Sequence, residues 1–352
     1  MKNCFCTLFD SRYLDRGLTL YESIDRHCDS FELWVLCMDD STYDFLAPLR
    51  LQNMRLIKLE ELEKHDSQLK EVKSERSQVE YYFTCKPSLT LYILDKCDYA
   101  SQVTYIDPDI FFFASPETIY EQLEGKSVAI TPHRFEHSKK YLEEYGKFNA
   151  GWVLFKRDVH GLACLRWWRE RCLEWCSDYP ESDRFADQKY IDRFSSLFEG
   201  VWSVDNIGVN LAPWNIAGKS ISCRKNKLYV DGEQVIFYHF HNLRPITKRV
   251  FNLGCKDYTA VLDNKVRRYI YRPYISSLLR KKDDLFFMPP PLARGGQKMS
   301  CEKANCQENL LGRCLKKVRF MIMLGKGLKR GEYMIGRQGV ASDCGASKAM
   351  HR

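Results

Sequence analysis

Two aspartates, Asp107 and Asp109, stand within an apolar and β-favouring run, VTYIDPDIFFF, at residues 103–113. Residues i and i+2 of an extended strand share one face, so both carboxylates can reach a single cation. Pro108 fixes its own φ and biases Asp107 towards an extended backbone. Two hard oxygen donors suit Mg²⁺ or Mn²⁺, which usually act with phosphate oxygens. The alternative is that Asp-Pro-Asp only ends a strand in a turn, because Asp and Pro both favour turns.

Further polar residues stand at the ends or starts of predicted elements. His239 lies near the end of a predicted strand at 235–240, and His241, two residues on, points the same way. Asn149 is followed by Ala and Gly before a predicted strand, where small residues let a ligand approach the backbone. Asp187 opens a predicted helix and serves equally well as a cap. A histidine in such a position is usually packed or hydrogen-bonded, unless carboxylates converge on it.

Lys86 offers a second way to bind an anion. The sequence predicts a helix over residues 86–97, with Pro87 in its first turn, where proline is tolerated. Backbone N–H groups at a helix start point outwards, so a diphosphate would be favoured beside Lys86. A solvent-exposed Lys86 fits the pattern equally well.

The elements that must position these residues alternate along the chain. Strands are predicted at residues 3–9, 31–38 and 54–59, with helical patterns between them. This order is typical of an α/β fold with a mostly parallel sheet and right-handed crossovers. Open α/β sheets bind ligands at the carboxyl ends of their strands, which is where Asp107 and Asp109 are expected.

Two common nucleotide-binding classes lack their motifs. No G-x-G-x-x-G follows the first predicted strand, where the sequence reads DSRYLDRG. Residues 218–220, Gly-Lys-Ser, resemble the end of a phosphate-binding loop, but the first glycine of that motif falls on Pro213. Dinucleotide oxidoreductases and P-loop NTPases are therefore disfavoured.

Charge and composition divide the chain near residue 280. Residues 281–352 hold 15 Lys or Arg against 6 Asp or Glu, whereas residues 1–280 hold 39 against 40. The sequence thus predicts a neutral main domain at 1–280, with nothing that favours nucleic acid, and a basic extension at 281–352. In that extension MPPPLARGGQ resembles a linker. Beyond the linker four apolar residues share one potential helix face amid basic residues, namely Leu311, Leu315, Val318 and Ile322.

Such a basic amphipathic helix can lie on an anionic membrane surface, and a solvated tail is the alternative. The amino terminus lacks the apolar core of a signal peptide, and no run of about 18 apolar residues is present. We therefore expect a cytoplasmic protein, in peripheral contact with the inner face of the membrane if the tail binds lipid. In that compartment the 15 cysteines would be reduced structural thiols.

The order of the motifs resembles one known group. A D-x-D after an apolar strand, an N-A-G before a strand, a D-Q on a helix and a late H-F recur in nucleotide-sugar glycosyltransferases of the GT-A fold. The chain looks most like bacterial relatives of the glycogenin and lipopolysaccharide-galactosyltransferase type. The similarity spans roughly residues 3–275 and is carried by five segments: CTLFDSRYLDRGLTLYESI, CKPSLTLYIL, YIDPDIFFF, FADQKYID and IFYHFH.

The resemblance implies a GT-A (Rossmann-like) fold, a mostly parallel central sheet flanked by helices. It implies that Asp107 and Asp109 hold Mn²⁺ or Mg²⁺ against the diphosphate of a nucleotide-sugar. The third ligand of the family, the histidine of H-F-x-G, falls on His239, although Asn242 replaces the glycine. His241 is the rival ligand.

The resemblance also assigns residues to the donor. The first turn, Asp10 to Leu14, and Asp39 would contact the nucleoside, while Arg12 and Lys86 would face base or phosphate. Three further positions match those that grip the donor sugar: Asn149, Asp187 and Gln188.

The implied activity is transfer of a sugar, from UDP in the first instance, to a glycan or lipid-linked acceptor. Both named relatives are retaining enzymes, which favours retention over inversion by analogy. Two alternatives remain: a sugar-nucleotide nucleotidyltransferase, and a binding domain without catalytic activity.

Overall fold

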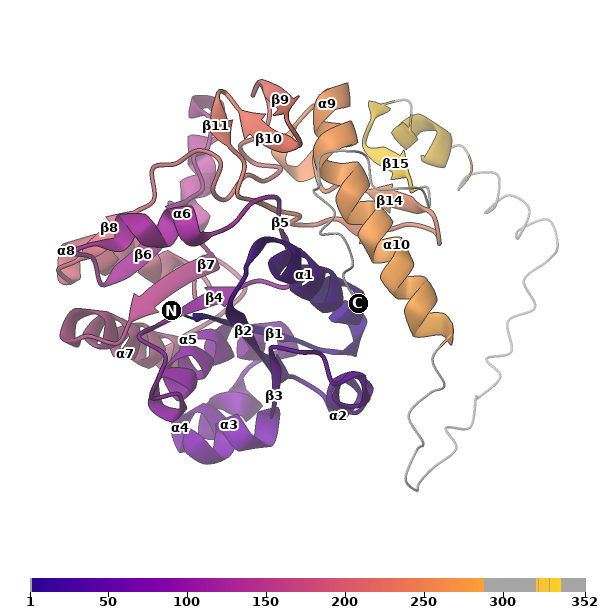
Figure 1. Ribbon diagram of the computed structural model, residues 1–352. Helices are drawn as coiled ribbons and strands as arrows, with labels where there is room; N and C mark the ends of the chain where they lie inside the picture. Colours follow the sequence, from indigo (N-terminus) through magenta and orange to yellow (C-terminus); the bar gives the residue numbers. More distant parts are fainter. Residues whose placement is uncertain (1, 288–320, 322, 329, 337–352) are drawn as a thin grey trace.

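The computed structural model describes residues 2–287, 321, 323–328 and 330–336. Its centre is a seven-stranded sheet of order β3-β2-β1-β4-β7-β6-β8 (Figure 1). The strand pairs β1/β2, β1/β4, β2/β3 and β6/β8 are parallel, and β7 runs antiparallel to β4 and β6. The predicted α/β architecture with a mostly parallel sheet is confirmed. The strands are β1 (Asn3–Phe9), β2 (Phe31–Cys37), β3 (Met54–Lys58), β4 (Gln102–Ile106), β6 (Val128–Pro132), β7 (Phe148–Lys156) and β8 (Val201–Ser203).

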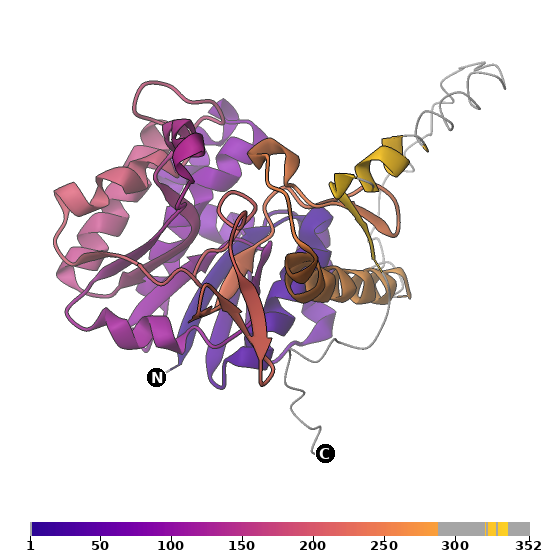
Figure 2. The same cartoon turned by 90° about the horizontal axis from the view of Figure 1, so that it is seen from above.

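Helices cover both faces of the sheet, because its strands bury side chains alternately on either side. In β4, Val103 and Tyr105 join one apolar core with α5 and α7, whereas Ile106 joins a second core with α1. Figures 1 and 2 place α10 alongside α1, and Ser277 Oγ of α10 donates to Glu22 Oε2 at 3.0 Å. The α-helices are α1 (Leu14–His27), α2 (Asp40–Leu46), α3 (Leu59–His65), α4 (Ser67–Glu71), α5 (Gln78–Lys96), α6 (Glu117–Tyr120), α7 (Val159–Glu174), α8 (Phe194–Leu197), α9 (Asn264–Val266) and α10 (Arg272–Phe287).

A two-stranded sheet joins parts of the chain that are far apart in sequence. β5 (Ile110–Phe112) pairs antiparallel with β12 (Phe237–His239), and this register sets His239 opposite Ile110. His239 is thereby held beside the residue that follows Asp109. Two three-stranded sheets complete the fold, one of β9 (Ile221–Arg224), β10 (Lys227–Val230) and β11 (Glu233–Gln234), the other of β13 (Arg244–Pro245), β14 (Val250–Asn252) and β15 (Tyr333–Ile335).

The basic extension is described only in part. α10 runs through the expected boundary at residue 280, and β15 returns from the extension to pair with β14. The predicted linker at 288–297 and the amphipathic face from Leu311 to Ile322 lie outside the described residues. None of the described helices is both long and apolar enough to cross a membrane.

The described cysteines mostly behave as small buried hydrophobes. Ten of them, Cys4 and Cys85 among these, are free and buried, as expected for structural thiols. Cys223 on β9 is instead disulfide-bonded, so the expectation of reduced thiols is wrong at that position.

Candidate active site

The Asp107-Pro108-Asp109 tripeptide forms the turn between β4 and β5. Gly151 O accepts a hydrogen bond from Asp107 N at 2.8 Å, and Asp107 O accepts one from Ile110 N at 3.2 Å. The expectation that the two aspartates share one face of an extended strand is therefore wrong. The turn nevertheless brings both carboxylates to the same place, so the predicted turn and the predicted cluster occur together.

His239 completes this cluster from β12. Its Nε2 lies 3.0 Å from Asp109 Oδ1 and 3.9 Å from Asp107 Oδ2. One ligand atom from each of the three residues lies within 4.8 Å of the others, the one such acidic and imidazole group in the described part of the chain. His241 is not in that group, although its ring centroid is 5.8 Å from that of His239.

The charges in the cluster stabilise one another. Burial alone would raise the pKa of Asp109, but the His239 imidazole holds that pKa well below its ordinary range. Burial alone would lower the pKa of His239, but the two carboxylates raise it. Burial and the neighbouring His239 lower the pKa of His241 to about 4, which leaves His241 neutral.

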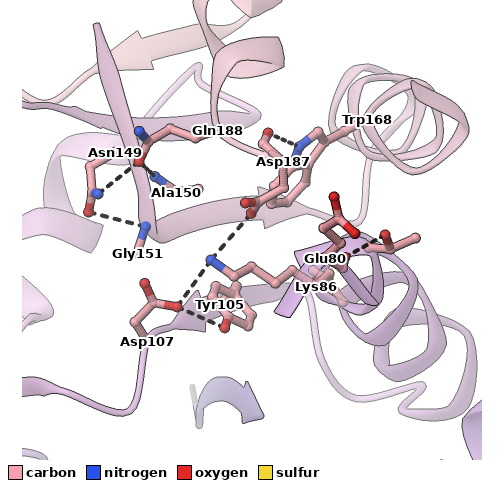
Figure 3. A network of polar contacts seen from close by, with 12 residues as sticks. Glu80, Lys86, Tyr105, Asp107, Asn149, Ala150, Gly151, Trp168, Asp187 and Gln188 are labelled. Atoms are coloured by element: carbon pink, nitrogen blue, oxygen red, sulfur yellow. Dashed lines mark hydrogen bonds and ion pairs between the residues drawn. The ribbon is translucent and has the colours of Figure 1, made fainter. Parts of the chain in front are cut away.

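Lys86 lies in the interior of α5 rather than at a helix start. α5 begins at Gln78, where Ser77 and Glu80 form a capping box. The prediction of an anion site at the start of a helix at residue 86 is therefore wrong, since the start signal lies in the charged stretch before it. Lys86 is buried, with Nζ 3.2 Å from Asp107 Oδ1 and 3.3 Å from Asp187 Oδ2 (Figure 3).

Asp187 precedes a short 3-10 helix, η6 (Lys189–Arg193), and is 1% exposed. Its backbone carbonyl accepts a hydrogen bond from Trp168 Nε1 at 2.8 Å. Burial is the main cause that raises the pKa of Asp187 to about 6, and Asp107 adds to it, although Lys86 opposes both. The ammonium of Lys86 is thus a shared counterion for the buried carboxylate of Asp187 and the half-buried carboxylate of Asp107.

Asn149 and Gln188 hold His239 in place, and Gly151 leaves room for its ring. Asn149 Oδ1 lies 3.1 Å from His239 Nδ1, and Asn149 Nδ2 donates to Gln188 Oε1 at 3.0 Å. A Cβ at Gly151 would lie 2.6 Å from His239 Cε1 and 2.9 Å from Asp107 Oδ2. The glycine is therefore required because the cluster itself closes on the backbone there.

The first turn of the chain forms the other side of the site. Asp10 caps η1 (Ser11–Tyr13) and accepts hydrogen bonds from Arg12 N at 3.0 Å, Arg12 Nε at 2.9 Å and Tyr82 OH at 3.0 Å. Asp39 caps α2 and accepts from Ser11 Oγ at 2.8 Å as well as from Thr42.

A cavity of about 680 Å³ lies between these two sides. Seven of the predicted residues line it: Asp10, Arg12, Lys86, Asp107, Asp109, His239 and His241. Five do not: Leu14, Asp39, Asn149, Asp187 and Gln188. Three of these five are nevertheless connected to the cluster. Asp187 is connected through Lys86, Asn149 contacts His239 directly, and Gln188 is connected through Asn149.

No known family model matches the chain. It is 31% identical over 296 residues to "Uncharacterized protein YfnD" of Bacillus subtilis (strain 168), a match that covers 83% of this chain and 93% of YfnD. YfnF of the same organism is 32% identical over 255 residues, covering 70% and 84%. The chain belongs to the YfnD family.

Solved structures with similar chains include several glycosyltransferases. An active-site mutant of LgtC is 16% identical to this chain. The match covers 75% of this chain and 98% of the LgtC chain, with a TM-score of 0.46. LgtC, described as a galactosyltransferase, in complex with donor and acceptor sugar analogues gives 19%, 59%, 75% and 0.41 for the same quantities. Mouse xyloside xylosyltransferase 1 gives 11%, 70%, 100% and 0.45.

Several residues of the cavity in this YfnD-family protein were missed by sequence reasoning. The hydroxyl of Tyr105 donates a hydrogen bond to Asp107 Oδ1 at 2.9 Å, and the hydroxyl of Tyr82 on α5 donates one to Asp10. The period-2 alternation of β4 could have placed Tyr105 beside Asp107, because residues two apart share a face. Tyr82 had no such signal, since its contact joins residues 72 positions apart.

Proposed function

We propose that this member of the YfnD family is a metal-dependent glycosyltransferase. It would move a sugar from a nucleotide-diphospho-sugar, UDP-linked in the first instance, to a hydroxyl of a glycan or lipid-linked acceptor. One observation carries the proposal: Asp107, Asp109 and His239 each offer a ligand atom within 4.8 Å of the other two, and all three residues line a cavity of about 680 Å³. That volume lies in the usual range for a small-molecule site.

The residues present fit Mn²⁺ or Mg²⁺. Two carboxylates and one imidazole form a mostly hard donor set. His239 has its Nδ1 occupied by Asn149, which leaves Nε2 directed at Asp109. Outer hydrogen bonds of this kind are what metal-binding histidines normally have. When bound, the cation supplies Lewis-acid stabilisation of the negative charge on the departing diphosphate.

The residues of the chain have separable tasks in the transfer. The anomeric C–O bond breaks with its electron pair going to the diphosphate, and a new bond forms from the acceptor oxygen, whose proton is taken up by the released diphosphate or by solvent. Arg12 lines the cavity and can meet the nucleotide, while buried Lys86 holds Asp107 and Asp187 in place. The family resemblance favours retention, so we assign the buried carboxylate of Asp187 to the sugar side of the site.

A nucleotidyltransferase and a binding domain without catalysis are the other candidates. Nucleotidyltransferases usually carry a glycine-rich phosphate turn after the first strand. Residues 10–13 instead carry charged and aromatic side chains, and the side chain of Arg12 donates to the carboxylate of Asp10. The buried pair of Lys86 and Asp187 favours an enzyme over a mere binding domain, because perturbed buried groups cluster at catalytic sites.

Calorimetry and a donor-hydrolysis panel test the proposal. UDP should bind in the presence of Mn²⁺ and lose that affinity when the cation is chelated. Among UDP-, GDP- and CMP-sugars, at least one should be hydrolysed to free nucleoside diphosphate. Release of pyrophosphate would identify a nucleotidyltransferase, and Mn²⁺-dependent binding without turnover of any donor, with or without acceptors, would identify a binding domain.

We also propose that the basic extension holds the enzyme at the anionic inner face of the cytoplasmic membrane. The support is its charge, 15 Lys or Arg against 6 Asp or Glu over residues 281–352. The full-length protein should co-sediment with anionic but not zwitterionic liposomes, and truncation at Pro289 should abolish that. Equal co-sedimentation of the truncated protein would contradict the membrane role.

A further inference from the structure

We propose that Asn149 and Gln188 are positioning residues that fix the tautomer of His239 and connect its ring to the segment at residues 137–145. This assignment deepens the proposed function and rests on it in one respect, that His239 is a metal ligand. For Asn149 it replaces the direct contact with the donor sugar that the family resemblance implies.

The orientation of the Asn149 amide is set by the backbone. Gly151 N lies 3.1 Å from one end of the amide, and a backbone N–H can only donate, so that end is the oxygen, Oδ1. The same Oδ1 lies 3.1 Å from His239 Nδ1. The imidazole nitrogen facing it must therefore carry the hydrogen. Neutral His239 then keeps its lone pair on Nε2, the atom directed at Asp109.

The other end of Asn149 is also occupied. Its Nδ2 donates to Gln188 Oε1 at 3.0 Å and lies 3.4 Å from His133 Nε2. Burial lowers the pKa of His133 to about 3, so that ring is neutral and can accept. A side-chain amide has two acceptor positions and two donor hydrogens, and all four are now used. Asn149 therefore has no free position for a sugar hydroxyl in this arrangement.

Gln188 is oriented in the same way by two backbone groups. Ala150 N donates to Oε1 at 3.3 Å, and Nε2 donates to the carbonyl of Tyr145 at 2.9 Å. A carbonyl can only accept, so a flipped Gln188 amide would oppose an oxygen to Tyr145 O and a donor to Ala150 N. The hydrogen bond between the two amides is therefore consistent with both orientations, and each side chain holds the other in place (Figure 3).

The chain of contacts begins at Tyr145, the last residue of η5 (His137–Tyr145). It passes through Gln188 and Asn149 and ends on His239, the third residue of the candidate metal cluster. A displacement of the η5 segment would first break the hydrogen bond of Gln188 to Tyr145 O. The contact of Asn149 with His239, which fixes the tautomer of the ring, would be affected last. The metal ligand is thereby coupled to a segment that precedes the site strand β7.

Two variants test the positioning role in the metal-free protein and in Mn²⁺ titrations without nucleotide-sugar. Asn149→Ala removes the acceptor for Nδ1, so the neutral ring can adopt the other tautomer, with a hydrogen on Nε2 instead of a lone pair. We expect an Mn²⁺ affinity about 10–100-fold weaker, the usual loss for an outer-shell partner. Gln188→Met keeps the side-chain length, leaves Asn149 in place but unsupported, and should give a smaller loss in the same direction.

Matched controls share the local chemistry without the histidine. Asn206 Oδ1 accepts from Gly208 N at 2.7 Å, the same asparagine-to-glycine bond as in Asn149 and Gly151, so Asn206→Ala tests the loss of that bond alone. Gln102→Met, at the opposite end of β4 from the site, matches Gln188→Met. Neither control should change Mn²⁺ affinity by more than about twofold, below the outer-shell range.

The imidazole ¹⁵N shifts of His239 give a readout that does not depend on activity. At a pH high enough to keep the ring neutral, the wild type should be protonated on Nδ1, and Asn149→Ala should populate the Nε2–H tautomer. Unchanged shifts, or unchanged Mn²⁺ affinity while the wild type binds Mn²⁺, would overturn the positioning role and leave the proposed function standing. A wild type that binds no Mn²⁺ would remove the proposed function, and the tautomer measurement would still decide the role of Asn149. If Asn149→Ala does not fold, Gln188→Met carries the same test.

Discussion

The two sides of the cavity use aspartate in opposite ways. On the first-turn side, Asp10 and Asp39 each receive several hydrogen bonds from Arg12, Ser11 and their neighbours. On the metal side, the Asp109 carboxylate meets His239 and receives no backbone N–H from the part of the chain that is described. Each carboxylate of the first pair is satisfied by several protein donors, whereas Asp109 is paired with the His239 imidazole, and Asp107 with the Lys86 ammonium and the Tyr105 hydroxyl.

This difference separates aspartates that hold the protein structure from aspartates that are available to a ligand. A carboxylate accepts roughly four hydrogen bonds, so one that is filled by its own chain fixes a turn and has little left for a ligand. A partly buried carboxylate that faces an imidazole remains costly unless a positive charge stays with it. The first-turn aspartates are therefore expected to shape the nucleoside pocket, and the aspartates at 107 and 109 to bind the ligand of the site.

Substitution of Asp109 should have the largest effect. Asp109→Asn removes one of two carboxylates and the main partner of His239, while the amide keeps a similar size. We expect metal-dependent turnover to fall by at least about 10³-fold, comparable with the loss of a principal electrostatic group. Turnover of the best donor in the hydrolysis panel measures this, with circular dichroism to show that the fold is intact. Near-normal transfer would remove the metal-site assignment and with it the contrast between the two sides.

Removal of the shared counterion should affect stability as well as activity. Lys86→Met leaves Asp107 and Asp187 without their buried ammonium. Breaking a buried ion pair at one partner typically costs about 3–5 kcal/mol, so thermal unfolding should move to clearly lower temperature. The exposed Lys96, at the end of the same helix, supplies the control Lys96→Met, which should leave the unfolding temperature unchanged. Equal stability of the two variants would contradict the counterion role.

The raised pKa of Asp187 predicts a pH dependence of stability with a definite sign. The folded-state pKa, about 6, lies above the ordinary value, so the ionised carboxylate destabilises the native state. The free energy of unfolding should fall as pH rises from about 4 to about 6, by up to ~3 kcal/mol. Asp187→Asn should flatten the curve in that window. The raised pKa of His239 acts in the same direction at higher pH, so it separates from the Asp187 contribution.

The sequence predicted the parts of this site that depend on local pattern. The alternation of strands and helices and the position of Asp107 and Asp109 after β4 follow from apolar runs and their termini, whereas the role of His239 as a ligand came from the family resemblance and stays a prediction. Pro87 resembles a first-turn proline and so predicts a helix start at Lys86, whereas α5 begins eight residues earlier, at Gln78. A second local signal, the capping box of Ser77 and Glu80, marks the actual helix start.

Other features of the site depend on contacts that leave no trace in a single sequence. Tyr82 reaches Asp10 across 72 positions, and Gln188 reaches Asn149 across 39. Residue type alone also does not show whether the acceptor positions of a carboxylate are occupied by protein donors, as in Asp39, or left available to a ligand. The donor count around each oxygen decides that, and it appears only once the chain is folded.

A comparison of the two histidines sharpens the metal side of the contrast. His239 belongs to the cluster and His241 does not, although the rings are neighbours. His239→Ala should weaken Mn²⁺ binding by more than about 10-fold, and His241→Ala by much less, as expected for a group outside the first coordination shell. Competitive Mn²⁺ titration ranks the two variants directly. The opposite ranking would make His241 the ligand.

The smallest effect is expected from the satisfied carboxylate of Asp39. Burial alone would raise its pKa, but hydrogen bonds from Thr42 and Ser11 lower it, so the carboxylate stays ionised and bonded. Asp39→Asn keeps one oxygen acceptor and weakens the cap of α2, which should cost about 1 kcal/mol. The KM for the donor should rise a few-fold because Ser11 loses support, while Mn²⁺ affinity stays unchanged. A loss of Mn²⁺ affinity in Asp39→Asn similar to that in Asp109→Asn would show that the two sides are not independent, since a residue that only fixes the first turn has no reason to act on the cation.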